Sequence, residues 1–599
     1  MKLPSILVCL LLAAASGLAA QTAAQTSPGA ESARLHDLFR REWETQLREN
    51  PVYATIVGRH DYDDRLPAMG RADLERRNGL WKGFLEELKR IDRSKLPAED
   101  VVSAEIFESE LEDRIADYEL GGWQMPFNAD SGFHSDFAFL AAQTTFRSVK
   151  DYDNYIRRLR QWPRYMNEQI ELMRVGLGRG MTVPRAVLDG YDATISAHLV
   201  EDPEQSVFYG PFRDLAQNLP ALPAAERQRL EREGRQVVTE AMVPGYRTFL
   251  DFYQKEYLPK ARTTLGASEL PEGRAFYAQQ IRHFTTLDLT PEEIHRTGLA
   301  EVERIDREMK EVIRQTGFQG DFAAFLQHLR TDRRFYPENG EALLKQAAWI
   351  AKRMDGKLPA LFGRLPRLPY TVEPVPDHIA PKYTSGRYFE PPQGGTQPGT
   401  YWVNVYKPET RPLYNLEALT LHEAVPGHHL QISLARELEG LPEFRRFLYI
   451  SAFGEGWGLY SEWLGLEAGF YTDPYSNFGR LTYEMWRACR LVVDTGLHAM
   501  GWTRQQALDY MASHTALPLH EVETETDRYI SWPGQALAYK MGELKIKELR
   551  RRAEKELGPR FDVRAFHDAV LGSGSIPLGV LEMNVDRWIT RVKGEGAGR

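Results

Sequence analysis

Three histidines and one glutamate stand within eight residues of a segment that reads NLEALTLHEAVPGHHLQISLARE. They are His422, Glu423, His428 and His429. Imidazole nitrogens and carboxylate oxygens are common zinc ligands, and a glutamate beside them can act as a general base. In the familiar zinc-peptidase helix, H-E-x-x-H, histidines four residues apart reach one ion. The segment therefore predicts zinc chemistry in which Glu423 takes a proton from water.

The spacing of the histidines differs from that motif. His428 follows His422 by six residues, which is about 240° around a regular helix. His429 is in phase with His422 but about 10 Å further along the axis. Pro426 cannot donate a hydrogen bond to the His422 carbonyl, and Gly427 permits unusual dihedral angles. We expect a bulge that brings His428 to His422; His429 is the alternative ligand or a substrate-facing residue.

A third ligand is predicted in the segment AFGEGWGLYSE, which covers residues 452–462. Glu455 lies between two glycines and follows His428 by 27 residues. Many zinc peptidases complete a His₂Glu site with a glutamate at such a distance. Glu462 is seven residues further, on the same helical face, and is expected to orient a histidine. A solvated surface carboxylate is the alternative for Glu455, but aromatic neighbours disfavour it.

Polar residues also crowd around a Pro-Gly break in the segment TDRYISWPGQALAYK, residues 526–540. Peptide hydrolysis needs a donor for the developing oxyanion, and Tyr529 or Tyr539 could supply one. Arg528 or Lys540 could bind the terminal carboxylate of a substrate. The alternative is an ordinary helix start with solvated charges.

Arg487, Asp494 and His498 fall near one face of the helix predicted from Phe478 to Met500. A charged stripe inside an otherwise apolar helix is either an internal polar network or a solvated face. The solvated face is favoured slightly for Arg487 and Asp494. We include His498 among the candidate catalytic residues.

Helical periodicity dominates the elements that must position these residues. Leu35, Leu38, Phe39 and Trp43 form one apolar stripe, and Thr290 begins a capping box ahead of another. Residues 366–415 are instead rich in Pro, Gly and Tyr. We therefore predict a mainly α fold with a small irregular or β element before the metal-binding helix, and a lobe boundary near 366–415.

Within that irregular segment, TYWVNVY (residues 400–406) is predicted to be a strand. An edge strand beside the zinc could pair with an extended peptide. A short internal hairpin is an equally good interpretation of the same pattern.

The chain of 599 residues has a formal charge of −9 and is 42% hydrophobic. This composition is that of a globular protein, and it argues against a nucleic-acid partner. Residues 1–20 carry a charged start, an apolar run and small residues, which predict a cleaved signal peptide and a periplasmic or secreted protein. Residues 21–30 are predicted to be a flexible lead, and 31–599 one helical domain. No internal apolar run is long enough to predict stable membrane insertion.

Three motifs, HEAVPGHHLQ, GEGWGLYSE and DRYISWPGQALAYKMG, resemble the bacterial family called domain of unknown function 885. That family is similar to helical zinc metallopeptidases of the gluzincin type, such as thimet-like oligopeptidases. The resemblance implies two helical lobes around a deep channel with zinc on its floor. It also implies His422, His428 and Glu455 as ligands and Glu423 as base.

The leading hypothesis is thus an exported zinc peptidase acting on short peptides. One alternative is a non-catalytic peptide-binding protein of the same fold, which the presence of Glu423 disfavours. Another is a zinc hydrolase of a different amide, such as a cell-wall fragment, which the sequence does not distinguish from a peptidase. The oligomeric state and the natural substrate are not indicated.

Overall fold

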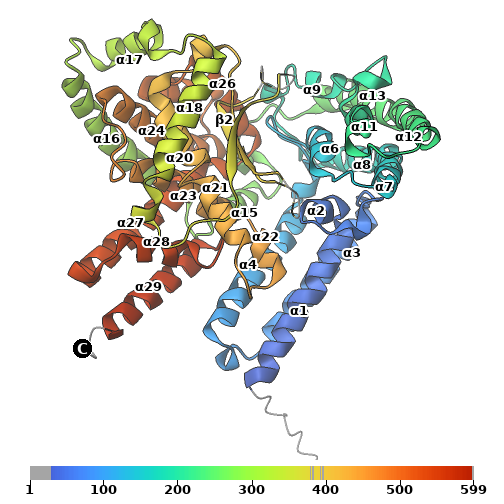
Figure 1. The fold of residues 1–599 in the computed structure, drawn as a ribbon, viewed down its shortest axis with the longest axis horizontal. Coiled ribbons are helices and arrows are strands. Elements are labelled where there is room, and N and C mark those ends of the chain that lie inside the picture. Colours follow the sequence, from blue (N-terminus) through green and yellow to red (C-terminus); the bar gives the residue numbers. More distant parts are fainter. Residues whose placement is uncertain (1–27, 378–379, 381–382, 392, 394–396, 596–599) are drawn as a thin grey trace, which may run out of the picture.

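The computed structural model describes residues 28–595 except 378–379, 381–382, 392 and 394–396. The predicted signal peptide therefore lies outside the described residues. Helices form most of the molecule, as the periodicity predicts, and Figure 1 shows a small sheet among them. No helix in the described part of the chain combines the length and apolar character needed to cross a membrane.

Most helices before residue 290 gather on one side of the molecule in Figure 1, and the last of them lies in the middle. They are α1 (Pro28–Glu49), α2 (Pro51–Ile56), α3 (Arg71–Lys89), α4 (Ala98–Leu120), α5 (Phe133–Asp136), α6 (Leu140–Gln143), α7 (Val149–Leu159), α8 (Trp162–Arg179), α9 (Ala193–Ser196), α10 (Gly210–Arg213), α11 (Leu215–Asn218), α12 (Ala224–Val237), α13 (Val243–Phe252), α14 (Leu258–Lys260) and α15 (Gly273–Thr285).

The later helices build the part that holds the candidate site. They are α16 (Pro291–Thr316), α17 (Phe322–Thr331), α18 (Gly340–Asp355), α19 (Leu358–Leu361), α20 (Leu416–Glu423), α21 (His428–Arg436), α22 (Glu443–Phe447), α23 (Ser451–Leu464), α24 (Pro474–Ala499), α25 (Arg504–His514), α26 (Leu519–Ser531), α27 (Ala538–Leu557), α28 (Val563–Leu571) and α29 (Leu578–Glu595).

Local sequence explains where the predicted helices begin and end. The apolar stripe of α1 is buried, with Leu35, Leu38, Phe39 and Trp43 at most 3% exposed. At the start of α16, the Thr290 hydroxyl accepts from the Glu293 N–H, and the Glu293 carboxylate accepts from the Thr290 N–H. The predicted capping box is therefore confirmed.

The sheet has three strands in the order β1-β3-β2, which are β1 (Tyr370–Pro374), β2 (Gly386–Phe389) and β3 (Gly399–Val403). β1 runs parallel to β3, and β2 runs antiparallel to it with Tyr388 opposite Tyr401. The predicted strand in TYWVNVY is thus confirmed in its first half. It is the central strand and not an edge, so β2 takes the place expected of an edge strand beside the site.

The spatial division of the chain does not coincide with the predicted boundary at 366–415. α16 lies well before that segment, yet it packs along α24. One contiguous apolar core also joins both sides, and it extends from Leu35 in α1 to Ile589 in α29. The change of side falls instead around α15, which lies in the middle of Figure 1 and packs against α4 as well as against α23, α24 and α27.

Burial on α24 corrects the expectation of a solvated face. Arg487 is 5% exposed, and Asp494 and His498 are completely buried. The stripe is therefore an internal polar network. Cys489, on the same helix, is a buried free thiol whose pKa is raised by burial.

Candidate functional site

A break between two helices brings the histidines together. α20 ends at Glu423 and α21 begins at His428, and the Ala424 ψ of −111° and the Gly427 ψ of −130° turn the chain between them. A Cβ atom on Gly427 would lie only 1.9 Å from the His422 carbonyl oxygen, so this close turn requires glycine. The predicted break at Pro426-Gly427 is therefore present.

α23 packs against this break and supports it. The Trp457 indole N–H donates to the Pro426 carbonyl at 2.8 Å. A Cβ atom on Gly458 would lie 2.7 Å from the His422 ring, so the absence of a side chain lets the imidazole rest on the helix. The small residues of the GEGWG segment thus allow α20 and α23 to approach closely.

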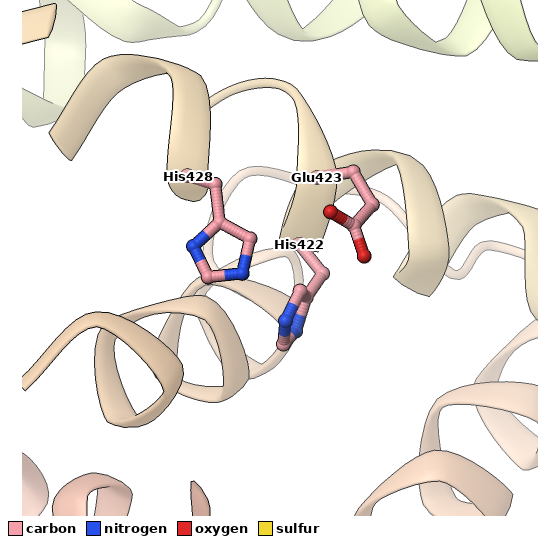
Figure 2. Close-up of side chains that lie close together, drawn as sticks. All are labelled: His422, Glu423 and His428. Atoms are coloured by element: carbon pink, nitrogen blue, oxygen red, sulfur yellow. The ribbon is translucent and has the colours of Figure 1, made fainter. Parts of the chain in front are cut away.

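Three side chains converge at this point. The rings of His422 and His428 stand nearly perpendicular, with centroids 4.8 Å apart. The Nε2 atom of each histidine lies 3.5 Å from Oε2 of Glu455. Figure 2 shows the two histidines with Glu423, and one ligand atom from each of these three lies within 4.8 Å of the others.

The spacing of the donors fits a zinc ion. Ligand atoms of a tetrahedral zinc, each about 2.0–2.1 Å from the ion, are roughly 3.4 Å apart. The two separations of 3.5 Å between imidazole Nε2 and the Glu455 carboxylate match this value. Two neutral imidazoles and one carboxylate are also the donor types that zinc takes in His₂Glu sites.

A second carboxylate orients His422 from behind. Nδ1 of His422 donates to Oε1 of Glu462 at 2.8 Å, while Nε2 faces Glu455. Arg487 approaches the same Glu462 oxygen at 3.6 Å. Such an outer carboxylate sets the tautomer and the direction of a ligating histidine, as we expected of Glu462.

Electrostatics keep this cluster ionised although it is buried. Burial by itself disfavours the charged forms, but His428 and His422 hold the pKa of Glu455 well below its usual value. For His422, burial also opposes protonation, and hydrogen bonding to Glu455 and Glu462 outweighs it and raises the pKa to about 10. A cation at this point, a proton or a metal, is therefore favoured by the surrounding carboxylates.

Glu423 lies beside the cluster and touches the sheet. Its Oε2 atom accepts a hydrogen bond from the backbone N–H of Tyr388 on β2 at 2.9 Å. The side chain also lines a cavity next to the cluster. Glu423 thus has a fixed position between the two histidines and the edge strand.

A cavity of about 490 Å³ opens over these residues. This volume lies within the range of small-ligand sites. Its walls come from residues far apart in the sequence, namely Asp130, Ser131, Thr384, Ser385, Gly386, Arg387, Tyr388, Glu390, Leu419, His422, Glu423, His428, Ile432, Tyr449, Ser451, Glu455, Tyr483, Trp486, Arg487, Arg490, Glu521, Glu525, Arg528, Trp532, Gln535 and Tyr539.

The ring of His429 contacts Tyr388 and Leu368 and does not join this cluster. Its Nδ1 atom is 3.0 Å from the Tyr388 hydroxyl, and its Nε2 atom is 3.1 Å from the Leu368 carbonyl oxygen. Burial lowers its pKa to about 4, which keeps the ring neutral. Of the two alternative ligands, the structure therefore brings His428 to His422 and Glu455.

The predicted substrate and oxyanion residues divide into two groups. Arg528 and Tyr539 line the cavity. Tyr529 does not, because its hydroxyl is buried against Trp486, Arg490 and Glu525.

His498 and Lys540 also lie away from the cavity. His498 accepts from the Ala267 N–H and donates to the Tyr529 carbonyl. Lys540 is completely buried and pairs with three glutamates, Glu301, Glu484 and Glu543, at 2.6–2.9 Å. The structure thus gives His498, Lys540 and Tyr529 packing roles away from the reacting groups.

Sequence reasoning missed several residues of the cavity. Tyr449 is 43% exposed, and its hydroxyl donates to Oε1 of Glu455 at 3.2 Å. Arg490 follows Arg487 by three residues on an apolar helix, a spacing that places both on one face. That repeated arginine was a usable indication, whereas nothing near Tyr449 in the sequence marks it.

The chain matches the bacterial proteins of unknown function called DUF885 over residues 51–585. It therefore belongs to that family. No curated protein matches it.

Two solved structures share the fold. A putative lipoprotein from Colwellia psychrerythraea has 28% identity and a TM-score of 0.89, over 94% of this chain and all of that one. A putative lipoprotein of unknown function from Shewanella oneidensis has 18% identity and a TM-score of 0.66, over 93% of this chain and 99% of that one. The second likeness is one of fold alone.

Proposed function

We propose that this protein is a zinc-dependent peptidase that hydrolyses short peptides. The observation that carries the proposal is the convergence of His422, His428 and Glu455, with Glu423 beside them and a cavity above. This donor set is that of His₂Glu zinc peptidases, and likeness to the gluzincin type is part of the same proposal.

The metal ligands and Glu423 would have different roles in peptide hydrolysis. Zinc held by His422, His428 and Glu455 would acidify a bound water and polarise the scissile carbonyl. Glu423, fixed by the Tyr388 N–H, takes a proton from the attacking water and passes it to the leaving amine. The water oxygen bonds to the carbonyl carbon as the C–N bond breaks.

The edge strand β2 supports a peptide substrate over other amides. The Tyr388 N–H points away from β3 toward Glu423, whereas the Ser385 carbonyl accepts from Asn404 beside β3. Because strand residues alternate, the Gly386 backbone faces the cavity side with that of Tyr388. An extended peptide could pair with this edge through its main chain.

Metal analysis and peptide cleavage test the proposal together. We expect one zinc per chain and loss of peptide cleavage on chelation, with recovery when zinc is restored. Glu423→Gln is expected to keep zinc and lose about 10²- to 10⁴-fold in kcat, the usual share of a general base. Glu439→Gln is the matched control, because Glu439 is exposed on the chain just after α21.

Two results would contradict this function. One zinc per chain in His422→Ala would contradict the proposed metal site. Unchanged peptide cleavage by Glu423→Gln would show that Glu423 is not the general base.

We further propose that the protein acts in the bacterial envelope or outside the cell. The N-terminal pattern of residues 1–20 and the likeness to the putative lipoprotein from Colwellia psychrerythraea support this location. Mass spectrometry of the protein from its native host checks it, since an intact Met1 in a cytosolic fraction would contradict export.

A further inference from the structure

Two arginines of α24 carry hydrogen-bond donors that the described residues leave unused. Arg487 and Arg490 line the cavity and are 5% and 2% exposed. Within the described part of the chain, Nε of Arg487 and Nη1 of Arg490 have no hydrogen-bond partner. A buried donor without a partner costs free energy, so a ligand that drew either guanidinium toward the cavity would pair a donor that now has no partner among the described residues.

Arg487 stacks on Trp486 and Tyr483, with its guanidinium carbon 4.3 Å and 4.7 Å from their ring centroids, but its hydrogen bonds are long. Its Nη1 atom lies 3.4 Å from the Tyr483 carbonyl oxygen, and Nη2 lies 3.6 Å from Oε1 of Glu462. Both separations exceed the 2.7–3.2 Å of an ordinary N–H···O hydrogen bond. Arg487 can therefore turn an edge of its guanidinium to a ligand without losing a good hydrogen bond.

Arg490, in contrast, is fixed in position. Nε donates to the Tyr529 hydroxyl and Nη2 to Glu525, each at 2.8 Å. Its guanidinium carbon lies 4.3 Å and 4.4 Å from the ring centroids of Trp486 and Tyr539. With these contacts satisfied, Nη1 is the nitrogen of Arg490 that remains without a partner among the described residues.

Beside α24, three guanidinium groups, those of Arg487, Arg490 and Arg528, share two carboxylates. Glu525 forms ion pairs with both Arg490 and Arg528, so one carboxylate faces two guanidinium groups. Glu462 is shared in the same way between Arg487 and His422. Burial raises the pKa of Glu521, another wall residue, to about 7, which leaves it only partly ionised near neutral pH. Asp130 is a further acidic residue of the cavity wall.

We propose that Arg487 and Arg490 bind the free α-carboxylate of the substrate, so that the enzyme removes residues from the carboxyl end of peptides. The inference rests on the proposed function. It moves the carboxylate site from Arg528 and Lys540, the pair considered from the sequence, to α24. Arg528 remains beside it through Glu525.

The position of Arg487 places this subsite next to the candidate metal ligands. Arg487 and His422 approach the same oxygen of Glu462, at 3.6 Å and 2.8 Å. In the last residue of a peptide, a single α-carbon separates the carboxylate from the scissile amide nitrogen. A carboxylate bound at Arg487 therefore brings the last peptide bond toward His422 and Glu423.

Binding measurements test the subsite apart from catalysis. Isothermal titration of the uncleaving Glu423→Gln protein uses three probes: N-acetyl-Ala-Ala-Phe, its C-terminal amide, and the amide of N-acetyl-Ala-Glu-Phe. We expect the free acid to bind at least roughly tenfold more tightly than either amide, the scale of one hydrogen bond to a charged group. Arg490→Gln added to this protein is expected to abolish the preference, and Arg490→Lys to restore only part of it.

The control is Arg480→Gln, a buried arginine of the same helix that pairs with Glu484 outside the cavity. It is expected to keep the preference, and thermal unfolding shows whether each variant folds. Equal binding of acid and amide, or a preference that survives in folded Arg490→Gln and Arg490→Lys, would overturn the subsite. Tight binding of the amide of N-acetyl-Ala-Glu-Phe would show that the arginines bind acidic side chains. That result would overturn their proposed binding of the terminal carboxylate. If the acid binds selectively but the wild type cleaves nothing, the proposed function fails and the subsite stands.

Discussion

Glu462 is the residue whose role can be isolated most cleanly. It does not line the cavity, yet its Oε1 atom accepts from Nδ1 of His422 at 2.8 Å. Glu462 is 1% exposed, so water has little access to its carboxylate. Any effect of Glu462 on metal binding must therefore pass through the orientation of His422.

Glu462→Gln tests this role with little change of shape. We expect zinc affinity to fall about 10- to 100-fold, the usual loss when a partner behind a ligating histidine is removed. Competition with a chelator of known affinity measures the change. Glu467→Gln is the control, because Glu467 pairs with Arg550 and not with the cluster. Unaltered zinc affinity in Glu462→Gln would show that Glu462 contributes to packing and not to metal binding.

At the scale of elements, the site depends on how closely α23 approaches α20. The ring of His422 occupies the space that a side chain at position 458 would need, since a Cβ atom there would be 2.7 Å from two ring atoms. A Cβ atom on Gly456 would likewise lie 2.5 Å from the backbone of Gly542 on α27. The helices can therefore pack as they do only with glycine at these points.

Gly458→Ala is expected to push the His422 imidazole away from Glu455. Overpacking of this kind typically costs about 1–3 kcal/mol of stability. We expect the variant to stay folded but to bind less zinc. Thermal unfolding and metal analysis separate the two effects. Gly178→Ala is the matched control, because Gly178 is also helical and nothing lies within 4 Å of its added Cβ. Normal zinc content in Gly458→Ala would show that the ring has room to move.

At the scale of the whole molecule, the cavity gathers residues from both sides of the fold. Asp130 and Ser131 come from the part before residue 290, and the rest of the wall comes from the later part. A half-open space of about 490 Å³ between these walls suits a ligand of small-molecule size. A folded protein would have to unfold locally to bring an extended segment to Glu423.

We therefore expect chelator-sensitive cleavage of peptides of a few residues and little cleavage of a folded protein. A graded series of peptides, digested beside one stable folded protein with and without chelator, measures this by mass spectrometry. Rates should fall as the substrate grows, because entry into the cavity becomes limiting. Cleavage of the folded protein as fast as the short peptides would contradict this limit on substrate size.

The helical class and the residues proposed to bind zinc could be predicted from the amino-acid sequence alone. Apolar side chains at helical spacing must be buried on one face, so the spacing alone was enough to locate α1, α16 and α24. The break at Pro426-Gly427 was also predictable, because proline and glycine act on the backbone locally. Nearness of His422 to His428 followed from that local turn.

The pairing of polar groups that are far apart in the chain could not be predicted and is seen in the fold. Tyr449, Arg490 and Glu525 join the cavity, whereas Lys540 and His498 are used in packing. Arginines and lysines on an apolar helix look alike in sequence whether they face a cavity or a buried carboxylate. Their roles depend on which carboxylates the neighbouring helices present, and the sequence does not say which helices become neighbours. Glu525 stands 35 positions from Arg490, and Glu484 stands 56 positions from Lys540, so only packing of the whole chain brings each pair together.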